Sequence, residues 1–129
     1  MDSDDQADKI LKSMTTDDYK VLIRNKDVLD RGTLNVTIEE LERIGETRLI
    51  QEIKRVLADN KIEKPTSHNK QNDQATEYYK IDLTPDDIDS IVSMFGNREV
   101  ESLGRDYEPT RAASFYATML DNWNKMLLD

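Results

Sequence analysis

Residues 47–57 read TRLIQEIKRVL and carry the clearest helix pattern in the chain. The apolar residues of this stretch recur at the spacing that places them on a single face of an α-helix: Leu49, Ile50, Ile53, Val56 and Leu57. Charged and amide side chains fill the positions between them. The stretch therefore predicts an amphipathic helix, capped by the hydroxyl of Thr47 and buried along one side.

The segment just before this helix has start and stop signals of its own. Thr37 and Glu40 have the spacing of a capping box, in which a hydroxyl and a carboxylate bond the first free N–H groups of a helix. Gly45 tolerates the left-handed conformation of a helix end. A short helix is therefore expected over 37–44, with an apolar face made by Ile38, Leu41 and Ile44.

Two more helices are predicted closer to the N-terminus. Thr15 and Thr16 offer a hydroxyl cap before two aspartates, and a helix that starts there should continue to Arg31-Gly32, where glycine permits a stop. An apolar stripe at helical spacing predicts a short helix over about residues 5–14. These segments complete the predicted N-terminal half, residues 1–60.

Residues 61–76 interrupt the helix signals. This stretch is rich in Lys, Asn, Gln, Ser and Asp and offers few apolar side chains. Because it buries too little apolar surface to offset the entropy lost on ordering, it is predicted to be a polar linker or a long loop. The residues that follow, 77–83, are expected to form a short extended or irregular piece that lies against the core.

The C-terminal half, residues 77–129, contains two strong helix starts. Thr84-Pro85-Asp86-Asp87 combines a hydroxyl cap, a proline at the first helical position and acids that suit the helix dipole. That helix is expected to end at Gly96, and a weaker helical turn at Gly104. From Thr110 to about Leu128 a broad apolar stripe predicts the longest helix, buried through Ala112, Phe115, Tyr116, Met119, Leu120, Trp123, Met126 and Leu127.

Together these signals predict an all-α fold, a compact helical bundle of about six to seven helices with a long polar loop between two halves. No stretch shows a strand pattern of comparable quality, and no unit repeats at a fixed period. Because chains near 60 residues are marginal as independent domains, the two halves are expected to pack into one domain over residues 1–129.

The composition argues against several classes of function. The 129 residues include no Cys, one His and four Gly, which removes disulfides, thiolate nucleophiles, zinc fingers and iron–sulfur clusters. A formal net charge of −9 disfavours nucleic-acid binding, which needs a basic face. No apolar run approaches the roughly 20 residues that span a bilayer, and the acidic first residues do not resemble a signal peptide. A cytoplasmic protein with no membrane contact is expected, with the nucleus as the alternative compartment.

The residues that could carry chemistry have simpler structural explanations. His68 lies in the polar stretch with no carboxylate or hydroxyl at helical spacing, so a catalytic triad or a His-ligated metal site is not expected. The aspartates at 86–89 suit a helix start and lack the frame of a calcium loop. The glycines are isolated and are expected to end helices rather than to cradle a phosphate. No enzyme activity, metal or cofactor is therefore expected, and Trp123 is expected to be a core residue.

Several stretches resemble parts of the death-fold superfamily, the six-helix bundles of death and death-effector domains. Residues 115–125, FYATMLDNWNK, are similar to the death-domain helix in which a Leu is followed three residues later by a Trp and then by a basic residue, and residues 86–91 resemble the helix before it. Residues 32–45 and 49–53 look like the closing two helices of such a domain. Here the Trp-bearing helix follows that pair instead of preceding it. The resemblance implies an adaptor of apoptotic or innate-immune signalling.

The composition and charge favour a non-enzymatic protein–protein interaction module, an adaptor or regulator that recognises its partner through charged helix faces. The partner-binding residues expected on those faces are Arg48, Lys54, Arg55, Asp86, Asp87 and Asp89. The expected partner is another protein, either a helical domain or a second copy of the chain in a homo-oligomer. The alternative is a small acidic inhibitor or nucleic-acid mimic, for instance a phage or bacterial regulator, that occupies a basic groove on its target.

Overall fold

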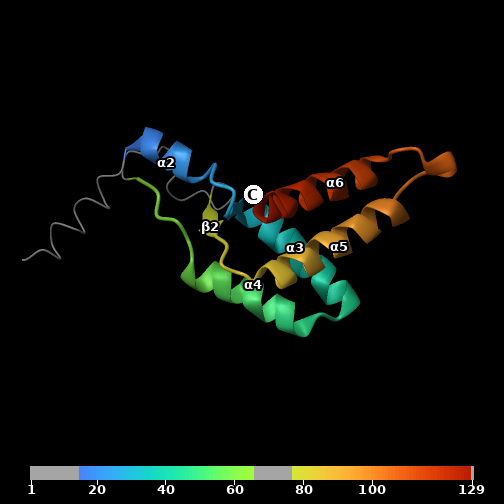
Figure 1. Cartoon of the computed structure of the whole chain (residues 1–129), viewed down its shortest axis with the longest axis horizontal. Helices are drawn as coiled ribbons and strands as arrows, with labels where there is room; N and C mark the ends of the chain where they lie inside the picture. Colours follow the sequence, from blue (N-terminus) through green and yellow to red (C-terminus); the bar gives the residue numbers. More distant parts are fainter. Residues whose placement is uncertain (1–14, 66–76, 129) are drawn as a thin grey trace, which may run out of the picture.

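The computed structural model describes residues 15–65 and 77–128, which form five α-helices and a small two-stranded sheet (Figure 1). In chain order the elements are α2 (Thr16–Leu22), β1 (Val28–Asp30), α3 (Arg31–Ile44), α4 (Thr47–Asp59), β2 (Tyr78–Lys80), α5 (Pro85–Glu101) and α6 (Arg111–Asn124). Two 3-10 turns, η2 (Arg105–Tyr107) and η3 (Lys125–Leu127), precede and follow α6.

Two helical hairpins, α3–α4 and α5–α6, share one hydrophobic core. Trp123 of α6 and Phe95 of α5 are fully buried in the same cluster as Leu34 and Leu41 of α3 and Ile53 of α4. The core therefore draws side chains from both sides of the polar stretch at 61–76. The mostly helical class is confirmed. The helix count in the described residues is five, not six to seven.

The start of α3 shows why the predicted boundaries in this region are wrong. The carboxylate of Asp30 accepts hydrogen bonds from the Thr33 N–H (3.1 Å) and the Thr33 hydroxyl (2.6 Å), which makes Asp30 the N-cap. Gly32 thus lies in the first turn of a helix instead of ending one. Thr37 lies inside the same helix, where its hydroxyl donates to the Thr33 carbonyl (2.7 Å), so the predicted capping box is not formed. Gly45 does end α3, with φ of 74°.

Helix α2 begins as predicted but is much shorter. The Thr15 hydroxyl accepts a hydrogen bond from the Asp18 N–H at 3.0 Å, the expected N-cap. The helix ends at Leu22, and the chain then turns into β1, so the predicted continuation to residues 31–32 is wrong. The apolar residues of the predicted continuation fit a helix locally, but two of them, Val28 and Leu29, are buried in an extended strand instead.

The small sheet departs from the prediction of a fold without strands. Strand β1 pairs antiparallel with β2 in the register Leu29 opposite Tyr79. On the other side of β2, Lys61 forms a bridge with Tyr79, and the Ile62 N–H donates to the Tyr78 carbonyl (2.8 Å). Within the extended or irregular piece expected over 77–83, residues Tyr78–Lys80 form the strand. Strands of three residues are too short to produce a recognisable alternation in the sequence.

Helix α5 starts where predicted and runs further than predicted. The Thr84 hydroxyl accepts a hydrogen bond from the Asp87 N–H (3.2 Å), and Pro85 occupies the first turn. Gly96 does not end the helix, which continues to Glu101 and absorbs the separate turn predicted before Gly104. A Cβ at Gly96 would lie 3.5 Å from the Leu120 side chain, so this glycine faces α6.

Helix α6 begins after Thr110, whose hydroxyl accepts a hydrogen bond from the Ala113 N–H (3.0 Å). Trp123 is buried, as predicted, whereas Ala112 and Phe115 of the predicted apolar stripe are exposed. The regular helix ends at Asn124, and the residues that follow form η3. The stripe is therefore buried mainly in its C-terminal part, where α6 packs against the rest of the molecule.

Three predictions fall outside the described residues. They are the helix over 5–14, the solvated state of His68 and the order of residues 66–76. In the part of the chain that is described, no helix combines the length and apolarity needed to cross a bilayer.

Candidate functional site

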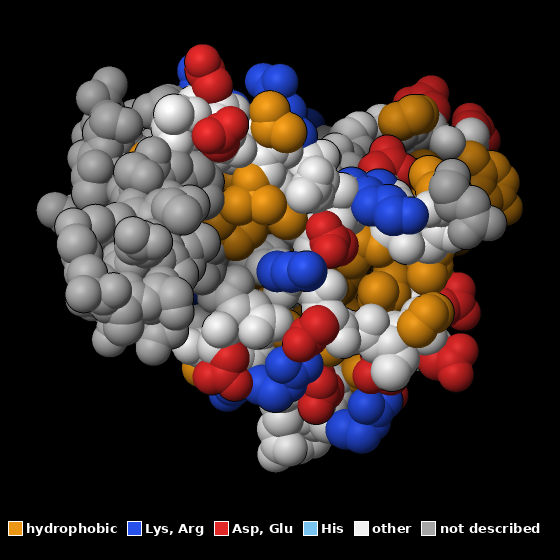
Figure 2. Space-filling view, turned by 60° about the vertical axis from the view of Figure 1, so that its left-hand side comes forward, with side chains coloured by type: hydrophobic (Ala, Val, Ile, Leu, Met, Phe, Trp, Pro, Cys, Tyr) orange, Lys and Arg blue, Asp and Glu red, His pale blue; other side chains and the backbone are white. Residues whose placement is uncertain are grey.

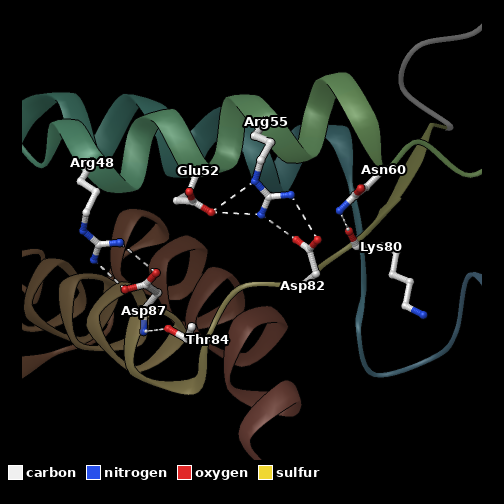
Figure 3. A network of polar contacts seen from close by, with 8 residues as sticks. All are labelled: Arg48, Glu52, Arg55, Asn60, Lys80, Asp82, Thr84 and Asp87. Carbon is white, nitrogen blue, oxygen red and sulfur yellow. Dashed lines mark hydrogen bonds and ion pairs between the residues drawn. The ribbon is translucent and has the colours of Figure 1, made fainter.

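Three of the six predicted partner-binding residues are engaged in ion pairs within the molecule (Figure 3). Arg48 of α4 makes two hydrogen bonds with the Asp87 carboxylate of α5, at 2.7 and 3.1 Å. Arg55 bonds Asp82 at 2.8 and 3.1 Å and also reaches Glu52. These bidentate contacts connect α4 to the start of α5 and to the segment that leads into it. Their charges are largely satisfied inside the chain.

The ion pairs also stabilise the charged form of both aspartates. The hydrogen bonds from Arg48 lower the pKa of Asp87, and those from Arg55 lower the pKa of Asp82, against the opposing effect of partial burial. Lys54, Asp86 and Asp89, the other three predicted residues, are exposed and make no ion pair with the described residues. The structure thus brings Arg48 and Asp87 together and leaves these three side chains facing solvent.

A carboxylate cluster that sequence reasoning missed lies where both ends of the polar stretch meet α3. Glu77 accepts hydrogen bonds from Arg31 (2.8 Å) and from the Tyr79 hydroxyl (3.0 Å), and Lys61 lies 3.2 Å from its second oxygen. The bond from Arg31, followed by those from Lys61 and Tyr79, lowers the pKa of Glu77 to about 2, although burial opposes the shift. Glu77 is 7% exposed, so this cluster acts as an internal clamp.

A second missed cluster surrounds Glu40, between α3 and the α5–α6 hairpin. Its carboxylate accepts hydrogen bonds from Arg98 (3.0 Å), Arg43 (3.0 Å) and the Tyr116 hydroxyl (2.9 Å). Burial raises the pKa of Glu40, but the bonds from Arg43 and Tyr116 and the charge of Arg98 together outweigh it and lower that pKa. Sequence spacing shows only the Glu40–Arg43 part of this cluster, since the other partners are more than 50 residues away.

Buried hydroxyl groups form a third polar cluster next to the core tryptophan. The Trp123 indole N–H donates to the Thr37 hydroxyl at 2.9 Å, and the Asn122 amide donates to the Thr33 hydroxyl at 3.2 Å. Among the described residues, no buried side-chain nitrogen or oxygen lacks a hydrogen-bond partner. The same residues contain no grouping of three or more His, Asp or Glu able to hold a metal ion. The polar interior is therefore explained by structural contacts.

The end of the α5–α6 hairpin, from Arg98 to Phe115, exposes large apolar side chains; we call it the hairpin tip. Tyr107 is 82% exposed, Val100 64% and Phe115 44%. Asp106 and Tyr107 both have positive φ, of 60° and 61°, a conformation that is uncommon for a bulky residue. Sequence reasoning placed Phe115 in the buried stripe of the last helix, so it missed this surface.

The backbone of the hairpin tip is fixed by its own hydrogen bonds. The Gly104 N–H donates to the Glu108 carbonyl (2.7 Å), and the Thr110 hydroxyl donates to the Ser102 carbonyl (2.5 Å). Through these contacts the turn between α5 and α6 holds Tyr107 in an outward position. No signal in the sequence indicates this exposure, because it depends on how far the hairpin extends beyond the rest of the molecule (Figure 1).

On the face of the molecule that Figure 2 shows, acidic and basic side chains are interspersed, with apolar side chains exposed between them. This distribution offers mixed contacts to a partner. It does not resemble the uniformly negative surface expected of a nucleic-acid mimic.

No protein-family model, curated protein or solved structure matches the chain. The resemblance of residues 115–125 and 32–53 to the death-fold superfamily is therefore neither supported nor contradicted, and it stays a prediction. The same holds for the apoptotic or innate-immune role that it implies.

Proposed function

We propose that this chain is a protein–protein interaction module, an adaptor or regulator without catalytic activity, and that it contacts its partner through the hairpin tip. The observation that carries the proposal is the 82% exposure of Tyr107 in a turn held by hydrogen bonds. Burial of an exposed aromatic side chain by a partner lowers the free energy of the complex, and tyrosine is enriched among the residues that dominate binding energy.

Backbone strain at the hairpin tip supports the same proposal. A non-glycine residue in the left-handed region costs free energy, and such strain is commonly kept at functional sites. The strain at Asp106 and Tyr107 contributes nothing to the core, because both side chains are exposed. A turn that holds an aromatic ring outward before binding lowers the entropy lost when the complex forms.

The charged residues predicted for partner recognition have a narrower role in this proposal. Arg48, Arg55 and Asp87 hold α4 against the start of α5 and its leading segment, so they support the fold. Lys54, Asp86 and Asp89 are free to steer an approaching partner electrostatically. Steering by exposed charges raises the association rate and weakens as salt increases.

An acidic inhibitor or nucleic-acid mimic is the second candidate function. Residues 77–97 hold five acids and one base, a net charge of −4. Three of these acids, Glu77, Asp82 and Asp87, are already paired with arginines, which places this candidate behind the interaction module. A mimic would be displaced from its target by DNA or RNA, whereas binding through the hairpin tip would not respond to either.

The proposal is tested by site-specific photocrosslinking in extracts of the source cells. A photoreactive phenylalanine analogue replaces Tyr107 in one variant and Val21 in a control variant, because Val21 is 67% exposed on α2, away from the hairpin tip. We expect a discrete crosslinked protein from position 107 and none from position 21. The captured protein is then purified and titrated with the wild-type chain and with Tyr107→Ala, which should bind about ten-fold or more weakly.

Equal crosslinking from both positions, or unchanged affinity of Tyr107→Ala for the captured protein, would contradict the proposed surface. Circular dichroism checks that Tyr107→Ala and the wild type have the same helix content. This is expected because Tyr107 is exposed and does not belong to the core cluster.

A further inference from the structure

Five of the seven charged side chains of the hairpin tip make no ion pair with any described residue. Of the eight arginines in residues 15–65 and 77–128, five are in ion pairs. Two of the other three, Arg105 and Arg111, lie at the hairpin tip. The carboxylates of Glu99, Asp106 and Glu108 also make no ion pair with any described residue. Charges of both signs are thus available there for an external partner.

The hairpin tip carries charges of both signs in nearly equal number. Residues 98–115 contain three arginines and four carboxylates, a net charge of −1. A partner of strong single charge, either acidic or basic, would leave part of this mixed set unmatched. A surface that carries both arginines and carboxylates can form ion pairs with a second copy of itself. A two-fold axis allows this because it places a residue of one copy opposite a different residue of the other.

The position of the hairpin tip allows two copies to approach each other there. Figure 1 shows the η2 end of the α5–α6 hairpin extending past the turn that joins α3 and α4. Contact between two hairpin tips would keep the acidic stretch at 82–89 of one copy away from that of the other, because this stretch lies at the opposite end of α5. This separation reduces the repulsion between two molecules of charge −9.

We propose that the partner of the hairpin tip is a second copy of this chain, so that the protein forms a two-fold symmetric dimer through Tyr107 and the unpaired charges around it. This inference rests on the proposed function and names the partner. Tyr107 lies at the centre of the interface, and Arg105 and Arg111 of each copy face carboxylates of the other.

The exposed apolar area predicts a weak dimer. Exposure of 82% for Tyr107, 64% for Val100 and 44% for Phe115 corresponds to roughly 300–400 Å² of side-chain surface per copy, given that a whole aromatic residue buries about 150–250 Å². Stable interfaces bury about 800 Å² per partner. A dissociation constant on the order of 0.1 mM is therefore expected, with monomer and dimer in rapid exchange.

The test is sedimentation velocity of the purified chain from about 5 µM to about 1 mM, in salt of about 0.15 M, where charges more than about 8 Å apart are largely screened. We expect the average mass to rise from that of a monomer, 15.0 kDa, towards twice that value. Tyr107→Ala should weaken association about ten-fold or more. The matched control Val21→Ala, which removes an exposed apolar side chain outside the hairpin tip, should leave it unchanged.

A pair of charge variants tests the symmetry without assuming which residues face each other. Arg105→Glu with Arg111→Glu makes the tip charge −5, and Glu99→Lys with Glu108→Lys makes it +3. Each variant alone should be monomeric at concentrations where the wild type dimerises, because like charges meet. Mixed in equal amounts, the two variants should associate at least as strongly as the wild type.

A monomer at every concentration would overturn this inference and would leave the crosslinking test of the hairpin tip unaffected, since a different protein could still be captured at position 107. A dimer that is insensitive to Tyr107→Ala and to both charge variants would also overturn it, because the contact would then lie on another surface.

Discussion

At the residue scale, the hydrogen bond between Trp123 and Thr37 is the buried contact with the clearest energetic consequence. Both side chains have 0% exposure, and the indole N–H has no other partner. Thr37→Val keeps the shape of the side chain and removes the acceptor, which leaves a buried donor unsatisfied. We expect a loss of about 1–3 kcal/mol in unfolding free energy. Urea unfolding followed by the fluorescence of Trp123, the single tryptophan, measures it.

Thr37→Ser is the matched control for this prediction, because serine keeps the hydroxyl and loses a methyl group. Its emission spectrum should remain that of the wild type, whereas Thr37→Val should shift the emission of Trp123. Equal spectra for the two variants would mean that the indole N–H does not depend on the Thr37 hydroxyl.

At the element scale, Gly45 and Gly96 give predictions of opposite sign. Gly45 ends α3 with φ of 74°, and a Cβ there would meet nothing within 4 Å, so Gly45→Ala adds backbone strain and no clash. We expect it to destabilise the protein by about 1 kcal/mol. Gly96 lies inside α5, and a Cβ would touch the Leu120 side chain at an ordinary 3.5 Å. Gly96→Ala should therefore stabilise by about 0.5–1 kcal/mol.

Thermal unfolding of the two glycine variants separates these effects directly. The melting temperature should fall for Gly45→Ala and rise for Gly96→Ala. Two shifts of the same sign would show that glycine has the same function at both positions, as the sequence alone suggested.

The accuracy of the element predictions depends on how local their signals are. The start of α5 at Thr84 and that of α6 at Thr110 were predictable, because a hydroxyl cap acts within three residues. The strands β1 and β2 were not, because each is held by a partner about 50 residues away. The prediction that α5 ends at Gly96 was wrong for the same reason, since the packing partner of this glycine, Leu120, belongs to another helix.

The ion pair between Arg48 and Asp87 tests whether the predicted binding residues support the fold. Arg48 is 68% exposed at its side chain, so Arg48→Glu should lower the melting temperature only slightly, by less than Thr37→Val does. Exchange of the two charges, Arg48→Asp with Asp87→Arg, should recover part of the loss. If Arg48→Glu has the same melting temperature as the wild type at low salt, the ion pair between Arg48 and Asp87 does not stabilise the fold.

At the scale of the whole molecule, the Glu40–Arg43 contact is the part of the polar clusters that sequence spacing could indicate. Glu77 bonds Arg31 across 46 residues, and Glu40 bonds Tyr116 across 76. Sequence reasoning located exposed charges from helical periodicity, and three of the six it chose are paired by tertiary contacts. Exposure of the hairpin tip likewise depends on the packing of the entire molecule.

The clamp around Glu77 gives a prediction for stability against pH. Its pKa is about 2 in the folded chain, mainly through the hydrogen bond from Arg31, compared with an ordinary value of 4.5. A carboxylate whose folded pKa is below its unfolded value stabilises the fold above the unfolded pKa, and that contribution is lost as the pH falls towards the folded pKa. Glu77→Gln should thus destabilise the protein at pH 7 by about 1–3 kcal/mol.

The difference in unfolding free energy between the wild type and Glu77→Gln should shrink as the pH falls from about 4.5 towards 2, because the wild-type carboxyl then becomes neutral as well. Urea titrations at pH 7, 5, 4 and 3, followed by Trp123 fluorescence, measure this difference. Glu63→Gln is the matched control, since Glu63 is exposed and makes no ion pair with the described residues. A difference that stays constant over this range would mean that Glu77 stabilises the fold by its shape and hydrogen bonds alone, without its charge.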